Sequence, residues 1–197
     1  MTFLTDFADQ AVMIPLILAV AATFAIQGWR RGAIVWLSAI GGTFLALLLL
    51  KFVFLSCMPV FGAWQVYSPS GHTAAATVVA GGLTLVATRR AGVILPLALV
   101  AAVIVGSTRI ALGLHSLPEV VIGAAVGLCG VLALRRCAGP VPRLRRLPVL
   151  CVVAAVAALF HGLHLPAERH IRLTAYRTAW LIPACRPPPH GTPGQYS

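Results

Sequence analysis

The distribution of charge along the chain limits its fold more than any other feature. Charged side chains are so sparse that long uncharged runs can be read directly from the sequence: 10–29, 32–50, 52–88, 91–108, 120–134 and 147–167. A transmembrane helix needs about 20 predominantly apolar residues, with a range of about 17 to 25. The runs therefore predict a polytopic membrane protein with about six transmembrane helices.

Composition excludes a water-soluble globular domain. Of the 197 residues, 59% are hydrophobic and 10% are charged, whereas soluble domains average about 45–50% and about 25%. The net charge of +11 raises nucleic acid as a partner, but most Arg residues occur as pairs between apolar runs and not along one face. We therefore expect the lipid bilayer as partner and no nucleic acid, and the sequence leaves the oligomeric state open.

The predicted fold is an all-α helical bundle with one membrane-embedded domain at 1–166. A basic, Pro-rich tail follows at 167–197, and its first part, 167–182, is expected to form an amphipathic helix at the membrane interface. Within the fifth run, Gly123 and Gly127 form a GxxxG pair. Such a pair predicts close contact between helices, because it lets two backbones approach each other.

The Arg residues predict the orientation in the membrane. They follow the first, third and fifth runs, at Arg30 and Arg31, Arg89 and Arg90, and from Arg135 to Arg146. Basic loops stay in the cytoplasm, so residues 51–72 and 109–119 are expected on the opposite, outer face. If the sixth run also crosses, Arg169, Arg172 and Arg177 lie outside, against the same tendency.

The first run is expected to remain in the mature protein as a membrane helix. Residues 1–29 contain no Lys or Arg and do contain Asp6 and Asp9, a pattern unlike a cleavable signal peptide. The five cysteines show no metal-ligand spacing. Cys57 and Cys185 fall on the predicted outer side, where a disulfide can form, but nothing in the sequence fixes such a pairing.

The few ionisable residues on the predicted outer face form a set suited to phosphate. The only Lys of the chain, Lys51, lies there with Glu119, and so do His72, Arg109 and His115. Ionisable groups near membrane depth are costly and mark candidate functional sites. Free N–H groups at a helix start bind phosphate oxygens, and an Arg can hold two such oxygens. The set therefore predicts a phosphate site at the interface.

Two motifs in this set resemble those of a known family. Residues 67–72 read YSPSGH, and Arg109 is followed by five residues, His115, three residues and Glu119. This pattern resembles the membrane-bound lipid phosphatase branch of the type 2 phosphatidic acid phosphatase (PAP2) superfamily, whose motifs are KxxxxxxRP, PSGH and SRxxxxxHxxxD. The motif-bearing core of the resemblance is 32–134.

The chain departs from the family pattern at three positions. In the first motif Lys51 and Pro59 match, but Met58 stands where the family has Arg. In the third motif Thr108 replaces Ser and Glu119 replaces Asp. The missing Arg removes one charged contact to the phosphate.

The resemblance implies a PAP2-like helical core and a phosphatase that uses neither metal nor other cofactor. It implies that His115, oriented by Glu119, attacks phosphorus to form a phosphohistidine, while His72 protonates the leaving oxygen. It also implies groups that bind the phosphate and stabilise its charge, namely Lys51, Ser70, Gly71 and Arg109.

The implied substrate is a membrane lipid phosphate or an isoprenoid pyrophosphate. Candidates are phosphatidic acid, phosphatidylglycerophosphate, undecaprenyl pyrophosphate and a lipid A phosphate, and the sequence does not choose among them. The expected location is a bacterial cytoplasmic membrane, with the active site facing the periplasm or exterior. Two alternatives stay open: a lipid phosphotransferase of the same chemistry, and a catalytically impaired relative that binds phospholipid, which Met58 and Glu119 favour.

Some of these residues also have a purely structural interpretation. Lys51 can be an ordinary helix-end Lys whose amine reaches water, and Arg109 can be an interfacial anchor. Residues 116–119 fit a capping box with Pro in the first turn, which explains Glu119 by helix initiation alone. We therefore expect the carboxylate to serve either the cap or His115, and not both.

Overall fold

The protein is all-α in the part that its computed structural model describes, residues 9–57, 61, 64, 66–88, 90–163 and 167–178. Seven helices are present there, and no strand. The helices are α2 (Gln10–Ile26), α3 (Arg30–Ser56), α5 (Gly71–Thr88), α6 (Ala91–Ala111), α7 (Leu117–Ala138), α8 (Arg146–Phe160) and α9 (Ala167–Thr178). The predicted fold class is confirmed.

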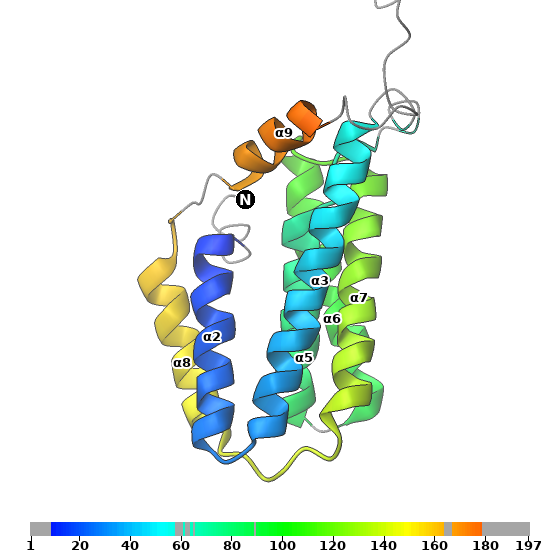
Figure 1. Cartoon of the computed structure of the whole chain (residues 1–197). Helices are drawn as coiled ribbons and strands as arrows, with labels where there is room; N and C mark the ends of the chain where they lie inside the picture. The colour runs from blue at the N-terminus through cyan, green and yellow to red at the C-terminus, as the bar shows by residue number, and fades with distance from the viewer. Residues whose placement is uncertain are drawn as a thin grey trace, which may run out of the picture.

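Six of these helices run alongside one another as a bundle, and α9 lies across one end (Figure 1). The centre of the bundle is α5, which packs against α3, α6 and α7. At the edge, α8 packs on α2, and α2 packs on α3. A buried hydrogen bond joins the edge to the centre, because Nε1 of Trp36 in α3 donates to the carbonyl oxygen of Ile17 in α2 at 2.9 Å.

Small residues let α7 approach α5 closely. A Cβ atom on Gly127 would lie 2.8 Å from the carbonyl oxygen of Ala74, and one on Gly123 would overlap the carbonyl oxygen of Ser70. No larger residue fits at either position without a shift of the backbone. The contact predicted from the GxxxG pair is therefore confirmed, and it brings the first turns of α7 against the segment that leads into α5.

Four of the helices are long and apolar enough to cross a membrane, namely α3, α5, α6 and α7. They correspond to the second to fifth predicted spans and indicate an integral membrane protein. The apolar helices α2 and α8 are shorter, with 17 and 15 residues. At about 1.5 Å per residue, 15 residues extend for less than the roughly 30 Å of a bilayer core. The first and sixth crossings stay predictions.

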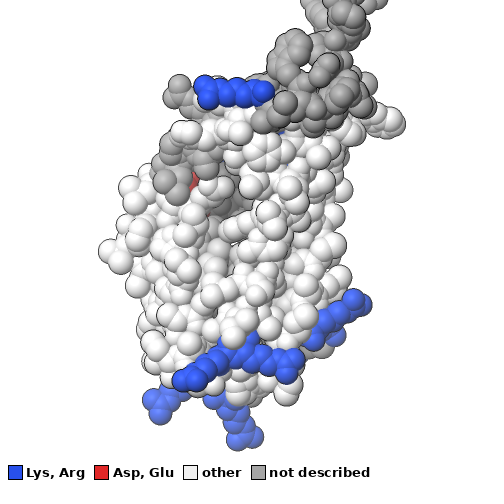
Figure 2. All heavy atoms as spheres, viewed as in Figure 1, with Lys and Arg blue, Asp and Glu red and all other residues white. Residues whose placement is uncertain are grey.

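Lys and Arg side chains gather at the two ends of the bundle in Figure 2, and the belt between them is nearly free of charge on the face shown. The Arg-rich end holds the α2–α3 and α7–α8 connections. There Nε and Nη2 of Arg31 donate to the carbonyl oxygen of Cys137 at 3.2 and 3.0 Å. Arg31 thus donates hydrogen bonds to a carbonyl group in the last turn of α7, where a cation is favourable.

The opposite end differs from the prediction in the length of one helix. The second span was expected to end at Lys51, but α3 continues to Ser56, so Lys51 lies inside the helix. The amphipathic helix predicted after residue 167 is present as α9, and residues beyond 178 lie outside the described part. A contact fixes α9 on α3, since the Ser56 hydroxyl donates to the buried Ala175 carbonyl at 3.4 Å.

The described part of the chain contains four cysteines in two different states. Cys57, directly after α3, is disulfide-bonded, and its partner lies outside the described residues. Cys129, Cys137 and Cys151 are free and exposed.

Candidate active site

A cavity of about 510 Å³ opens beside α9, where Figure 2 shows the surface hollowed. It has a polar wall and an apolar wall. The polar wall is formed by Asp9, Lys51, Gly71, His72, Arg109, His115 and Arg172. The apolar wall is formed mainly by α2 and α3, through Met13, Ile14, Phe44, Leu47 and Leu48. The cavity thus brings together the two histidines, the Lys and the Arg of the predicted phosphate site.

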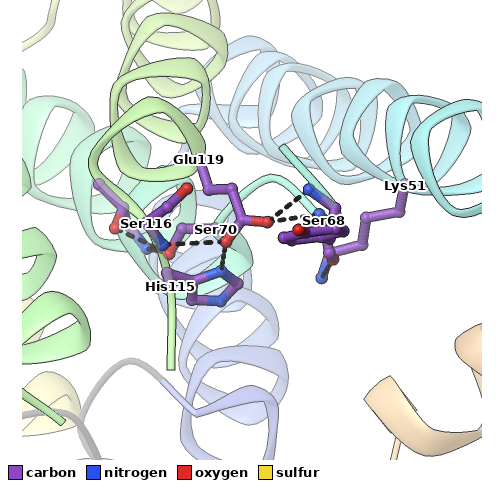
Figure 3. Close-up of polar contacts among 8 residues, drawn as sticks. Lys51, Ser68, Ser70, His115, Ser116 and Glu119 are labelled. Atoms are coloured by element: carbon purple, nitrogen blue, oxygen red, sulfur yellow. Dashed lines mark hydrogen bonds and ion pairs between the residues drawn. The ribbon is translucent and has the colours of Figure 1, made fainter. Parts of the chain in front are cut away.

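The carboxylate of Glu119 connects the parts of this site (Figure 3). Its Oε1 atom accepts the N–H groups of Tyr67 and Ser68, both at 2.7 Å. Its Oε2 atom lies 2.8 Å from Nδ1 of His115 and accepts the N–H group of Ser116 at 3.1 Å. The expectation that the carboxylate serves either the cap or His115 is therefore wrong. It serves both, because two carboxylate oxygens offer about four acceptor sites.

This contact also determines which nitrogen of His115 carries the proton. An ionised carboxylate only accepts hydrogen bonds, so the Nδ1 atom facing Glu119 carries the proton. In the neutral ring the lone pair is then on Nε2. Glu119 is only 4% exposed, which keeps this hydrogen bond away from bulk water.

The turn between α6 and α7 places Arg109 and His115 together. The carbonyl oxygen of Arg109 accepts the N–H groups of Leu114 at 3.0 Å and of His115 at 3.4 Å. Gly113 closes the turn with a φ of 67°, a left-handed conformation that glycine adopts most readily. The five-residue spacing between Arg and His therefore corresponds to one compact turn that starts at the end of α6.

Lys51 is held inside the site by the segment that precedes α5. Its Nζ atom donates to the Ser68 hydroxyl at 2.9 Å, and Lys51 is only 6% exposed. The side chain passes Gly71, where a Cβ would lie 3.8 Å from Cε of Lys51. The alternative in which this amine simply reaches bulk water is therefore wrong.

Ser70 differs from its predicted role as a phosphate contact. Its N–H group donates to the carbonyl oxygen of Glu119 at 3.0 Å, and its hydroxyl is 2.9 Å from that of Thr73. Ser70 is completely buried, so these bonds fix the loop instead of meeting a substrate. Gly71 and His72, which open α5, do line the cavity. The first N–H groups of a helix have no partner within it, which suits an anion.

Two charged residues of the cavity wall were not predicted as site residues. Asp9 is the N-cap of α2, and its Oδ2 atom lies 3.8 Å from Nε2 of His72. The position of an Asp directly before an apolar run is a helix-start signal, but it does not indicate a partner. Arg172 reaches the cavity from α9, and no local pattern predicts this, because the position depends on how α9 packs against α3.

The sequence profile of the PAP2 superfamily matches residues 11–143 of the chain. The chain belongs to the PAP2 superfamily. Membership implies a phosphatase or phosphotransferase that acts on lipid phosphates. No curated protein and no solved structure matches the chain.

The departures from the PAP2 motifs have different structural consequences. Thr108 is buried and its hydroxyl donates to the carbonyl oxygen of Val105 at 2.7 Å, so the replacement of Ser is accommodated within α6. Glu119 reaches His115 directly despite its extra methylene group. Met58 and Pro59 of the first motif lie outside the described residues.

The change Glu119→Gln tests the double role of the carboxylate. The amide oxygen can still accept the two N–H groups of the loop, but the NH₂ group then faces two donors, Nδ1–H of His115 and N–H of Ser116. We expect kcat to fall on the order of 100-fold, because His115 loses its orientation. The free energy of unfolding should fall by about 1–3 kcal/mol, because buried donors lose their acceptor.

Phosphate release and thermal unfolding of the purified variant in detergent measure these two effects. A variant with the kcat and the melting temperature of the wild type would show that the carboxylate neither orients His115 nor supports the loop.

Proposed function

We propose that the protein hydrolyses a lipid phosphate or an isoprenoid pyrophosphate without a metal, through a phosphohistidine on His115. The observation that carries this proposal is the shared cavity wall, where a His oriented by a carboxylate faces a second His and two cations. These are the groups that a phosphoryl transfer through a histidine nucleophile needs.

In the first step, the lone pair on Nε2 of His115 attacks phosphorus and an N–P bond forms. The P–O bond to the leaving group breaks, and its electron pair stays on the leaving oxygen; the leaving group is the lipid alcohol of a lipid phosphate or the lipid monophosphate of a pyrophosphate. His72, in its protonated form, gives its proton to that oxygen. The hydrogen bond from Nδ1 of His115 to Glu119 stabilises the positive charge that develops on the attacking ring.

In the second step, water attacks the phosphorus of the phosphohistidine. His72, now neutral, accepts a proton from the water as the new P–O bond forms. The N–P bond breaks, its electron pair returns to Nε2 of His115, and inorganic phosphate leaves. Both histidines are then in their starting states.

The cations of the wall stabilise the phosphoryl group during both steps. Lys51 and Arg109 face the same cavity, and the first turn of α5 adds backbone N–H groups beside them. The position of Lys51 depends on Glu119, because its Oε1 accepts the N–H of Ser68 and the Ser68 hydroxyl accepts a hydrogen bond from Lys51.

The apolar wall supports a lipid as the substrate. Residues of α2 and α3 line the cavity with hydrocarbon directly beside the polar groups. A molecule with a phosphate at one end and hydrocarbon next to it can contact the polar wall with its phosphate and the apolar wall with its hydrocarbon. Phosphatidic acid, phosphatidylglycerophosphate, undecaprenyl pyrophosphate and a lipid A phosphate all have this form. Transfer of the phosphoryl group to a second lipid would use the same first step and differ in the acceptor alone, so analysis of the products separates the two reactions.

Phosphate release from a panel of these lipids, measured with purified protein in mixed micelles containing EDTA, tests the proposed function. We expect activity on at least one lipid, and a loss on the order of 10³-fold or more in His115→Ala, since the nucleophile is removed. The matched control is His161→Ala, because His161 follows α8 and does not line the cavity. Equal rates for wild type and His115→Ala would contradict the proposal, and silence of both across the panel would favour a phospholipid-binding relative.

We further propose that the cavity end faces the periplasm or exterior of a bacterial cytoplasmic membrane. The Arg-rich end lies opposite, as expected for a cytoplasmic side. The disulfide at Cys57 supports the same orientation, because disulfides form and persist in oxidising compartments.

Labelling with a membrane-impermeant maleimide tests this orientation. Cys137 is free and exposed at the Arg-rich end, and Ala111 is exposed at the cavity end. In a background without Cys129 and Cys151, we expect Cys137 to react only after the cells are permeabilised. With Cys137 also replaced, Ala111→Cys should react in intact cells. The reverse pattern would show that the cavity faces the cytoplasm.

A further inference from the structure

Asp9 brings an acidic group to a cavity whose other charged groups are cations. Its Oδ1 atom accepts the N–H group of Ala11 at 2.9 Å, and its Oδ2 atom lies 3.8 Å from Nε2 of His72. Asp9 is only 7% exposed. A buried carboxylate at this place repels a phosphate, so substrate binding does not explain it.

The start of α2 does not explain the charge either. An N-cap needs a side chain that accepts a hydrogen bond, and Asn or Ser does this about as well as Asp. The PAP2 profile match begins at residue 11, so Asp9 lies outside it. The charge of Asp9 therefore calls for a reason beyond the helix cap, among the cations and histidines that line this cavity.

The position of His72 supplies that reason. The groups that face the cavity with it are Asp9 from the start of α2, Lys51 from α3, Arg109 and His115 around the α6–α7 turn, and Arg172 from α9. Burial and positive neighbours both disfavour a proton on an imidazole, whereas a carboxylate close to the ring favours it. Asp9 is the acidic residue among these neighbours. Its Oδ2 atom lies close to Nε2 of His72.

The two histidines thus differ in their distance from the neighbouring carboxylate. Glu119 is in hydrogen-bond contact with Nδ1 of His115 at 2.8 Å, which leaves Nε2 of that ring as the nucleophile. Asp9 is at ion-pair distance from Nε2 of His72, beyond the reach of a direct hydrogen bond. A proton on Nε2 is therefore not bound in a direct hydrogen bond to Asp9, and it can be passed to a third group.

We propose that Asp9 is a positioning residue for the general acid: its charge favours the protonated form of His72, against the burial and the cations that oppose it, so that the ring can protonate the leaving oxygen. This role deepens the proposed function and depends on it. Asp9 itself neither gains nor loses a proton, and the proton passes from His72 to the alkoxide as the P–O bond breaks.

Substrates that differ in their leaving group test this role. An alkyl phosphate leaves as a strongly basic alkoxide and needs the acid, whereas a nitrophenyl phosphate leaves as a stable phenolate and needs it little. Asp9→Asn keeps a capping acceptor and removes the charge. We expect its kcat to fall by about 10- to 100-fold on the alkyl lipid phosphate and by less than about 3-fold on the nitrophenyl phosphate. KM should not rise on either substrate, because Asn no longer repels the phosphate, and the basic limb of the kcat profile should move to lower pH.

Asp9→Glu separates the charge from the helix cap. Glu keeps the charge but is a poor N-cap, so on our account it retains more alkyl-phosphate activity than Asp9→Asn. A purely structural role predicts the opposite order and equal losses on both substrates. That result, or an Asp9→Asn variant as fast as the wild type, would overturn the role of Asp9 alone. A wild type inactive on both substrates would overturn the proposed function, and this role with it.

Discussion

One buried carboxylate holds the polar end of this bundle in place. Glu119 begins α7, accepts two N–H groups from the segment before α5, and lies against the ring of His115. Water competes little for these bonds at a buried position, so each has more effect than on a surface. The same group starts a helix, fixes a loop and holds one ring nitrogen of a histidine, and the Ser68 hydroxyl in that loop accepts a hydrogen bond from Lys51.

Much of the fold follows from the long uncharged runs and from small residues. The uncharged runs correspond to the helices α2, α3, α5, α6, α7 and α8. Lipid offers no hydrogen-bond partners, and a helix forms all of its backbone hydrogen bonds within one segment. The GxxxG pair of Gly123 and Gly127 indicated the contact of α7 with α5. The motifs also indicated that Lys51, His72 and Arg109 share one end of the bundle: His72 and Arg109 lie in the terminal turns of their helices, and Lys51 lies five residues before the end of α3.

The sequence was less informative where tertiary contacts decide. It offered Ser70 as a phosphate contact, but the Glu119 carbonyl takes its N–H group. It treated Asp9 and Arg172 as signals of topology, whereas helices from the two ends of the chain bring both to the cavity wall. Local patterns report which face of a helix is apolar, and they do not report which distant residue meets it.

Identification of a phosphorylated residue during turnover tests the central claim most directly. The wild type is mixed with substrate, quenched in alkali, which preserves an N–P bond, and its peptides are analysed by mass spectrometry. The account predicts phosphate on His115, accumulating in the wild type and absent from a His115→Ala variant. Turnover with no phosphorylated residue, or with phosphate on His72 or another side chain, would contradict it.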